Sequence, residues 1–337
     1  MTDRRSNYMK TWLKPTLWIL AAVLLLAIGA AAGYGAYLTD KVRESAEDSH
    51  EELGRGGKSD KRTTAVTPGE DNLSVLFVGV DASAARLEKN EDRSSLSDAL
   101  ILATFNNDEK SVRLLSIPRD TYTYIPEVDR KDKITHAHAY GGIDSTVETV
   151  EGLLDIPVDY YARFNFSAFI EVVNAVGGIK YEVPYDLEEQ NSEGKDGAIE
   201  LEEGRQLLNG EEALALARTR KLDSDLARGQ RQMELIKAIA REMNSFSSFR
   251  NYDNIIDAVG EDLTTNMTFD QMIAFKDYFL KEDGFDFKTM QLDGEGGYAS
   301  NGAWYFMTDE ESLEKTKDRL RNHLELPEEP EAQEPPG

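Results

Sequence analysis

The chain contains no cysteine, and this absence excludes several kinds of chemistry at once. Without thiols there can be no disulfide framework, no cysteine nucleophile and no thiolate metal site, so the fold has to be stabilised by buried apolar side chains. The sequence also lacks a glycine-rich phosphate loop of the Walker type, an internal repeat and any pattern that supports a zinc site. Thiol chemistry, zinc chemistry and P-loop nucleotide hydrolysis are therefore not expected.

Basic residues are scarce: 38 Lys and Arg stand against 63 Asp and Glu, which gives a formal net charge of -25. Binding to duplex nucleic acid rests on a broad basic face, so we expect no nucleic acid partner. With 337 residues, of which 40% are hydrophobic, the chain can bury one sizeable core. A local concentration of arginine in so acidic a chain requires an explanation, and its ligand should be compact.

One such concentration begins at Arg218, where arginines alternate along the sequence before a predicted helix. Arg228 and Gln232 are one helical turn apart, so their side chains share a face of that helix. The planar guanidinium groups of Arg218, Arg220 and Arg228, together with the Gln232 amide, can converge on phosphate oxygens. A solvated helix surface, paired with the acidic residues at 211–212, is the alternative for this run taken alone.

A second basic element follows the strand-like segment 112–117. Pro118 ends that segment and is followed by Arg119 and Asp120, which places a guanidinium group at the exit of a strand. Ligand sites of open α/β sheets gather at such exits. Two separated basic elements favour one anion with several phosphates over an ordinary charged surface.

The amino terminus carries the features of a membrane anchor. Residues 16–38 are uncharged, and at about 1.5 Å per residue they can span a bilayer core of roughly 30 Å. Basic residues precede this run and an acid-rich stretch follows it, so the positive-inside rule predicts a cytoplasmic amino terminus and an external remainder. A cleaved signal peptide is the alternative, because small residues lie near the end of the run, but such peptides use a shorter apolar region.

The rest of the chain divides by composition. Residues 39–70 are rich in charge and glycine and lack apolar periodicity, which is typical of a linker, and residues 325–337 alternate proline and glutamate. The expected organisation is a cytoplasmic tail over 1–15, a transmembrane anchor over 16–38, an extracytoplasmic linker over 39–70, a folded domain over 71–324 and a disordered tail over 325–337.

Strand-like and helical segments alternate within the folded domain, which predicts an α/β fold. Continuous apolar runs of strand length suit a sheet that is covered on both faces, and they lie at 73–80, 99–105 and 112–117. Helical spacing predicts helices at 144–154, 167–176, 211–217 and 225–243. Further strands are expected at 179–183, 289–292 and 303–306.

Two carboxylates flank the first two predicted strands. Asp81 comes directly after 73–80, and Asp98 directly before 99–105. If these strands pair antiparallel, the end of one lies beside the start of the other, and both carboxylates come within reach of one Mg²⁺ ion. A lone aspartate at a strand end is more often a turn former or a helix cap. The arginines favour the shared Mg²⁺, because the ion and the guanidinium groups neutralise complementary parts of a pyrophosphate.

Several longer motifs run through the domain in a fixed order: NLSVLFVGVD, SDALILATF, SVRLLSIPRDTYTYIP, KITHAHAYGG, LLDIPVDYY, NAVGGI, LNGEEALALARTRK and DSDLARGQRQ. Together they resemble the LytR-CpsA-Psr (LCP) family, and most closely its wall teichoic acid transferases. The similarity is strong over residues 72–243 and looser over the rest of the external part. Because many long motifs occur in the same order, the resemblance is specific.

The resemblance implies an α/β/α sandwich around a central mixed sheet, with a deep apolar pocket for a polyprenyl chain. It implies a Mg²⁺-assisted phosphotransfer, in which an anionic glycopolymer, expected to be wall teichoic acid, moves from an undecaprenyl-pyrophosphate carrier to peptidoglycan. The acceptor would be the 6-hydroxyl of N-acetylmuramic acid. A place in the cell membrane of a Gram-positive bacterium, with the catalytic domain outside, follows from the same resemblance.

Roles for single residues are carried over by position. The metal ligands would be Asp81 and Asp98, and the pyrophosphate ligands would be Arg93, Arg119, Arg218, Arg220, Arg228 and Gln232. The catalytic group would be Arg119 with a carboxylate, Asp81 or Asp120, that helps to deprotonate the sugar hydroxyl. Many family members have an arginine directly before the Ser-Asp pair, where this chain has Leu96, and Arg93 is the nearest substitute.

The apolar pocket and the rival functions complete the expectations. Aromatic and aliphatic residues that could line a lipid pocket are Phe164, Phe166, Phe169, Ile170 and Val173. His136 and His138 alternate beside two glycines and are expected to be structural rather than catalytic. The same arginine clamp would also suit a hydrolase of prenyl pyrophosphates, and a non-enzymatic wall-binding or regulatory membrane protein is a third interpretation.

Overall fold

The computed structural model describes residues 49–80, 96–219, 225–243, 263–268, 270–272, 274, 286–299 and 301–327. In these ranges no helix has the length and apolar character that crossing a bilayer demands. The cytoplasmic tail and the anchor predicted over residues 1–38 lie outside the described residues, as does most of the predicted carboxyl-terminal tail. Of that tail, Leu326 is described, and it packs partly buried against the core.

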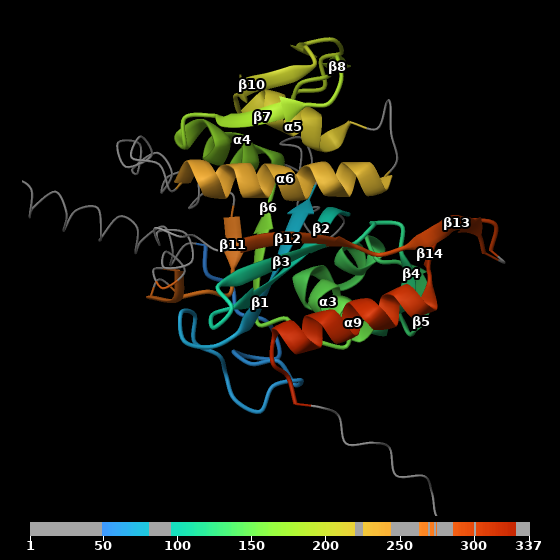
Figure 1. Cartoon of the computed structure of the whole chain (residues 1–337). Helices are drawn as coiled ribbons and strands as arrows, with labels where there is room; N and C mark the ends of the chain where they lie inside the picture. The colour runs from blue at the N-terminus through green and yellow to red at the C-terminus, as the bar shows by residue number, and fades with distance from the viewer. Residues whose placement is uncertain are drawn as a thin grey trace, which may run out of the picture.

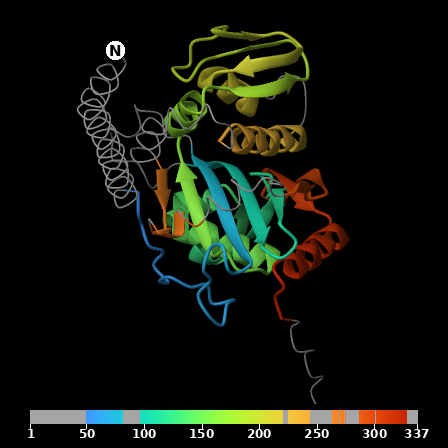
Figure 2. The same cartoon turned by 60° about the vertical axis from the view of Figure 1, so that its left-hand side comes forward.

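A six-stranded mixed sheet forms the centre of the domain (Figures 1 and 2). Its strands, in spatial order, are β11 (Leu263–Thr265), β6 (Tyr160–Phe164), β1 (Leu73–Val80), β2 (Ser97–Asn106), β3 (Ser111–Ser116) and β12 (Asp286–Gln291). β2 is antiparallel to both of its neighbours, β1 and β3, whereas β6 is parallel to β1 and β12 is parallel to β3. The mixed sheet and its strongly apolar central strands agree with the sequence prediction.

Both faces of the sheet are buried. Successive side chains of each central strand point to opposite sides of the sheet, and both sets pack against helices. Leu76 and Val78 of β1 pack on one side with the helices α3 (His136–Leu154) and α9 (Glu310–His323). Leu73 and Val75 face the other side, where Met233 of helix α6 (Asp225–Met243) completes a separate cluster. The central sheet is therefore sandwiched between helices, as predicted.

A smaller layer lies above α6 in the view of Figure 1. It contains the helices α4 (Phe166–Ala175) and α5 (Gly210–Arg218) and the strand pairs β7 (Ile179–Val183) with β10 (Gly204–Leu208) and β8 (Leu187–Glu189) with β9 (Ile199–Leu201). Its core includes Leu235 and Ala238 of α6. Helix α6 is thus shared between the two layers, and it holds them together.

Two hairpins lie at the right-hand side of the molecule in the view of Figure 1. One joins β4 (Tyr122–Ile125) to β5 (Arg130–Lys133) through the short 3-10 helix η2 (Pro126–Val128). The other joins β13 (Gly294–Tyr298) to β14 (Trp304–Thr308). A bridge between Thr121 and Phe306 ties the second hairpin to the chain that enters the first. The sequence predicted a strand near β14 but neither hairpin.

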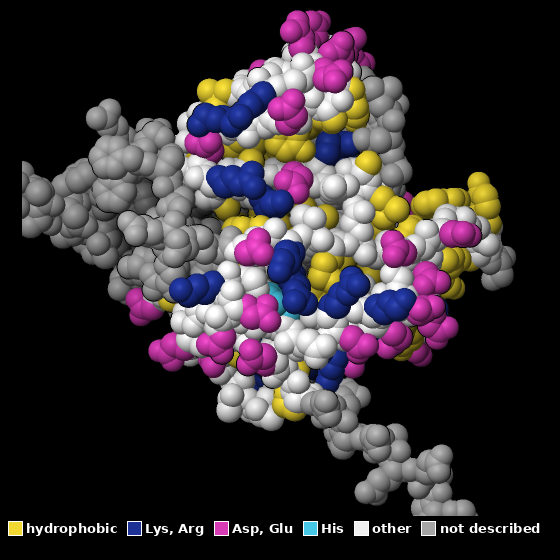
Figure 3. All heavy atoms as spheres, viewed as in Figure 1, with side chains coloured by type: hydrophobic (Ala, Val, Ile, Leu, Met, Phe, Trp, Pro, Cys, Tyr) yellow, Lys and Arg dark blue, Asp and Glu magenta, His cyan; other side chains and the backbone are white. Residues whose placement is uncertain are grey.

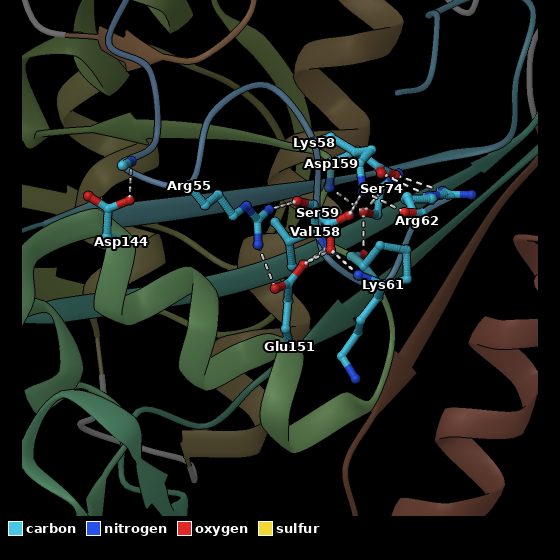
Figure 4. A network of polar contacts seen from close by, with 12 residues as sticks. Arg55, Lys58, Ser59, Lys61, Arg62, Ser74, Asp144, Glu151, Val158 and Asp159 are labelled. Carbon is cyan, nitrogen blue, oxygen red and sulfur yellow. Dashed lines mark hydrogen bonds and ion pairs between the residues drawn. The ribbon is translucent and has the colours of Figure 1, made fainter. Parts of the chain in front are cut away.

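The linker expected over residues 39–70 is corrected by its described part, which packs along the domain (Figure 4). Leu53 is buried in the main core. Arg55 Nη1 lies 2.5 Å from Glu151 Oε2 on α3, and Arg62 Nη2 lies 2.7 Å from Asp159 Oδ2. The Ser59 hydroxyl donates a hydrogen bond of 2.6 Å to Glu151. Ion pairs to distant parts of the chain, rather than apolar periodicity, hold this segment in place.

Candidate functional site

A cavity of about 230 Å³ lies where β1 ends and β2 begins, between the sheet and the helices α4, α5 and α6. Polar groups from four elements or their exits line it: Asp98, Arg119, Arg218, Arg228 and Gln232. Its remaining walls consist of apolar side chains and of glycine at position 79. Five of the predicted site residues therefore meet around a single cavity, although they are spread over much of the sequence.

The pairing of β1 with β2 explains why Asp98 lies at this cavity. The two strands are antiparallel, and Gly79 pairs with Ala99 while Val80 pairs with Ser97. The end of β1 therefore lies beside the start of β2, and the antiparallel pairing on which the metal prediction depended is confirmed. Asp81 follows Val80 directly in the sequence. Asp81 itself, like Arg93 and Arg220, lies outside the described residues.

Arg119 enters the cavity from the tight turn that follows β3. The Thr121 amide donates to the Pro118 carbonyl at 3.0 Å, so the chain reverses direction around Arg119. Its Nη1 donates to Asp98 Oδ1 at 2.5 Å, and its buried Nε has no hydrogen-bond acceptor among the described residues. A buried guanidinium donor without an acceptor is well placed to bind an oxygen of a ligand.

Asp120, predicted as a catalytic carboxylate, lies next to this site rather than on the cavity wall. Its side chain is buried, Oδ1 lies 2.7 Å from Lys133 Nζ, and Oδ2 lies 3.9 Å from Arg119 Nε. Two cations therefore compensate the charge of this carboxylate, as burial of a charge requires. The sequence did not predict a role for Lys133, because the β4–β5 hairpin has to fold back before Lys133 lies beside Asp120.

Arg218 lies in the last turn of α5, where the helix dipole favours cations. Arg218 stacks on Phe166, with its guanidinium carbon 4.7 Å from the ring centroid. The side-chain amide of Gln232 on α6 donates a hydrogen bond of 3.2 Å to the Ala217 carbonyl. Both contacts fix cavity-lining polar groups in place, so the region is largely organised before a ligand binds.

Arg231 belongs to the same basic run but has a structural role. Its side chain is buried, and it donates to the Leu216 carbonyl at 3.0 Å and to the Thr219 carbonyl at 2.7 Å. These carbonyls end α5 and have no partner within that helix. Arg231 therefore holds the end of α5 against α6 and so positions Arg218.

Three of the five residues that were predicted to line a lipid pocket lie on the apolar walls of this cavity. Phe164, Phe166 and Phe169 line the cavity. Val173 does not, because it is fully buried in the core of the smaller layer, and Ile170 instead packs against Gly210 at the start of α5. The sequence missed the lining residues that come from β2 and from the helices α5 and α6, which are Ala99, Ile101, Leu214, Ala217, Leu235 and Ile236.

The two histidines that were expected to be structural, His136 and His138, do not line the cavity. His136 Nδ1 lies 3.0 Å from Asp132 Oδ1, and His138 is buried within α3. Neither residue lines the cavity, and neither does Leu96, which occupies the position where many family members have an arginine.

A metal ion would find only part of its ligands in the described residues. These contain no group of three or more acidic or histidine side chains close enough together to hold an ion. Among the described residues, Asp98 is the one carboxylate on the cavity wall, and one of its oxygens is bound by Arg119. Mg²⁺ is commonly held by one or two protein carboxylates together with substrate phosphates. Asp98 fits such a site, in which the phosphate supplies the remaining ligands.

Comparison with known proteins agrees with this architecture. The model of the LytR_cpsA_psr family matches residues 36–322. The teichoic acid transferase TagT of Bacillus subtilis is 41% identical over 324 residues, which cover 95% of this chain and 97% of the relative. The transferase TagU of Halalkalibacterium halodurans is 35% identical over 317 residues, which cover 93% of this chain and 100% of the relative.

Solved structures of TagT share the fold. One, described as TagT bound to LIIa-WTA, is 42% identical with a TM-score of 0.71 and covers 82% of this chain and 100% of that one. Another, TagT with bound octaprenyl pyrophosphate lipid, is 38% identical with a TM-score of 0.66 and the same coverage. The chain belongs to the LytR-CpsA-Psr family, and the family predicted from the motifs is confirmed.

Proposed function

We propose that this protein transfers an anionic glycopolymer, of the wall teichoic acid class, from an undecaprenyl-pyrophosphate carrier to the 6-hydroxyl of N-acetylmuramic acid in peptidoglycan. One observation carries the proposal: three arginines line the same cavity as three phenylalanines. The arginines suit a pyrophosphate and the apolar wall suits a prenyl chain. A relative with 38% identity is described with octaprenyl pyrophosphate bound, and relatives named teichoic acid transferases cover most of the chain.

In this proposal the pyrophosphate is held by Arg119, Arg218, Arg228 and Gln232, with Arg93 and Arg220 as further donors. The acceptor hydroxyl attacks the phosphorus that carries the glycopolymer, and a new P–O bond forms. The bond from that phosphorus to the bridging oxygen breaks, and undecaprenyl phosphate leaves with the electron pair. The arginines stabilise the charge that grows on the leaving phosphate.

The proton of the acceptor hydroxyl passes to a carboxylate. Asp81 and Asp120 are the candidates, and Asp120 forms an ion pair with Lys133 beside Arg119. Asp98 and Asp81 would hold Mg²⁺, which would neutralise phosphate charge when bound. Removal of divalent ions by a chelator should lower the rate, and added Mg²⁺ should restore it. A rate that is unchanged in the chelator would refute the metal part of the proposal.

The comparison of two arginine variants tests the role of the cavity. Arg119→Ala should lower the transfer rate by about 10²–10³-fold, which is the usual effect of deleting a group that stabilises transition-state charge. Arg241→Ala is the matched control, because Arg241 is exposed near the end of α6 and lies away from the cavity wall. Equal rates for wild type and Arg119→Ala would refute the assignment.

We further propose that residues 16–38 anchor the chain in the cell membrane, with the amino terminus inside and the domain outside. The support is the uncharged run and the basic residues before it. Protease added to intact protoplasts should degrade the domain. Protection of the domain from protease in intact protoplasts would reverse the proposed orientation.

A further inference from the structure

The β13–β14 hairpin presents two aromatic side chains to solvent, directly opposite each other. Tyr298 on β13 pairs with Trp304 on β14 in the antiparallel register. Tyr298 is 77% exposed and Trp304 is 39% exposed, and both are among the few large apolar side chains that the described residues leave exposed. Figure 3 shows the hydrophobic surface of this hairpin at the right-hand edge of the molecule. Cross-strand partners share one face of a hairpin, so the two rings form a single aromatic surface.

The opposite strand is shaped to seat the indole ring. A Cβ atom on Gly296 would lie only 2.4 Å from Cζ2 of Trp304, so the indole rests against bare backbone at that position. On the same strand, a Cβ atom on Gly294 would lie 2.3 Å from the Met307 carbonyl oxygen and 2.7 Å from the Phe306 ring. Glycine in a strand interior weakens the strand and often marks close approach of another group. Here the glycines leave room for two aromatic rings of β14.

The hairpin is fastened to the segment that carries the candidate catalytic groups. The Phe306 amide donates to the Asp120 carbonyl at 2.8 Å. Tyr305 is buried against Tyr122, with 4.6 Å between ring centroids, and Lys133 Nζ lies 5.8 Å from the centroid of the Tyr305 ring. Trp304 is two residues before Phe306, which corresponds to about 7 Å along a strand. The aromatic surface thus lies a short distance from the turn that holds Arg119 and Asp120.

The charge of the hairpin restricts what can bind there. Over residues 294–308 Glu295 is the only charged residue, and residues 309–311, which follow, are all acidic. An anionic lipid surface or the anionic donor polymer would be attracted by basic residues, which this sequence lacks. Sugar rings present apolar C–H faces that can stack on aromatic rings, and Tyr and Trp add a polar O–H or N–H group that can reach a hydroxyl or water. A glycan strand without charge on its sugar backbone fits this surface best.

We propose that the Tyr298–Trp304 surface binds sugar units of the acceptor glycan strand of peptidoglycan, next to the unit whose hydroxyl is phosphorylated. This proposal deepens the proposed transfer reaction and rests on it for the identity of the ligand. The contact would position the acceptor and would take no part in the chemistry. The donor site at the arginine cavity is a separate surface.

The test uses the full chain and soluble peptidoglycan glycan oligomers. Trp304→Ala and Tyr298→Ala should each weaken oligomer binding by about tenfold, the loss expected for a central aromatic residue of an interface. Trp304→Phe should retain most of the binding, because it keeps an aromatic face. Gly296→Ala should also weaken binding, since its methyl group displaces the indole while both rings remain. Tyr124→Ala is the control, because Tyr124 is 47% exposed on β4 and lies outside the β13–β14 hairpin.

Transfer kinetics separate this proposal from the proposed function. The hairpin variants should raise KM for the oligomer about tenfold and leave kcat and prenyl pyrophosphate binding unchanged. Unchanged oligomer binding in Tyr298→Ala and Trp304→Ala would overturn the inference even if transfer occurs. Hairpin-dependent oligomer binding without any transfer would keep the glycan surface and reject the reaction. Loss of binding to anionic phospholipid vesicles, with oligomer binding intact, would assign the hairpin to the membrane instead.

Discussion

Gly229 on α6 determines how closely the arginines of α6 approach Arg119. A Cβ atom at this position would lie 2.2 Å from Oγ and 3.1 Å from Cβ of Ser116, the last residue of β3. An ordinary contact begins near 3.4 Å. Because Ser116 is buried, we expect α6, rather than a turn of the Ser116 hydroxyl, to take up this overlap by moving up to about 1 Å from the end of β3. Arg228 and Gln232 move with the helix, whereas Arg119 stays with the turn after β3.

Opposing effects set the size of the change in stability. Overpacking costs about 1–3 kcal/mol of unfolding free energy, and the gain in helix propensity from glycine to alanine returns about 1 kcal/mol. The free energy of unfolding should therefore fall by at most about 2 kcal/mol. The effect on activity should be larger, because a misplacement of about 1 Å in a catalytic site can lower the rate by about 10²-fold.

A transfer assay and urea unfolding of the same samples test this prediction. Gly152→Ala on α3 is the matched control, because no atom lies within 4 Å of a Cβ added there. Ser116→Ala removes the closest atom, so the double variant Gly229→Ala/Ser116→Ala should recover most of the lost rate. Wild-type turnover by Gly229→Ala, or a double variant as slow as the single one, would refute the proposed packing.

The remaining predictions concern the cavity, one buried histidine and the packed amino-terminal segment. Ile236→Trp should obstruct the cavity and weaken prenyl pyrophosphate binding in a titration, whereas Ile239→Trp on the same helix should not, because Ile239 packs against the core of the smaller layer; equal binding by both variants would contradict the lipid assignment. Burial, with a contribution from the positive charge of Arg113, lowers the pKa of His323 to about 4. As the pH falls below about 6.5, the histidine is therefore protonated in the unfolded state before it is protonated in the folded state. The contribution of this histidine to the free energy of unfolding is complete above that pH and is lost below it. At pH 5 the unfolding free energy should be about 2 kcal/mol lower than at pH 7 from this group alone, and urea unfolding of His323→Gln should lack that part of the pH dependence; parallel pH profiles would exclude it. Glu151→Ala should lower the unfolding free energy by about 3–5 kcal/mol, because it leaves Arg55 and Ser59 without their carboxylate, and trypsin should then cleave within residues 55–62 far faster than in wild type; unchanged cleavage would show that the ion pairs do not hold the segment.

The central strands and α6 could be predicted from the sequence because their patterns are local. The apolar runs gave β1 and β7 with the bounds that the structure shows, and α6 likewise begins and ends as predicted. Helix α3 begins earlier than predicted, at His136, because it continues through non-helical Gly141 and Gly142. The packing of residues 49–70 could not be predicted, since it depends on ion pairs with carboxylates far along the chain.

The candidate site likewise contains residues that the sequence could predict and residues that it could not. The scarcity of basic residues made Arg119, Arg218 and Arg228 conspicuous, and the structure brings all three to one cavity. Lys133 was not conspicuous, because its relation to Asp120 arises only when the β4–β5 hairpin folds back. Leu235 and Ile236 resemble ordinary core residues in sequence, and only the packing of α6 shows that they line the cavity.

The most direct test of the proposed transfer is mass spectrometry of the products formed from a prenyl-pyrophosphate-linked saccharide and peptidoglycan oligomers in water that carries a heavy oxygen isotope. A transferase joins saccharide phosphate to the oligomer through a phosphodiester in which every oxygen comes from donor or acceptor, so the product carries no heavy oxygen. That unlabelled phosphodiester is the predicted result. Free saccharide phosphate that contains heavy oxygen, with the oligomer unchanged, would show that water is the acceptor and would identify a hydrolase instead.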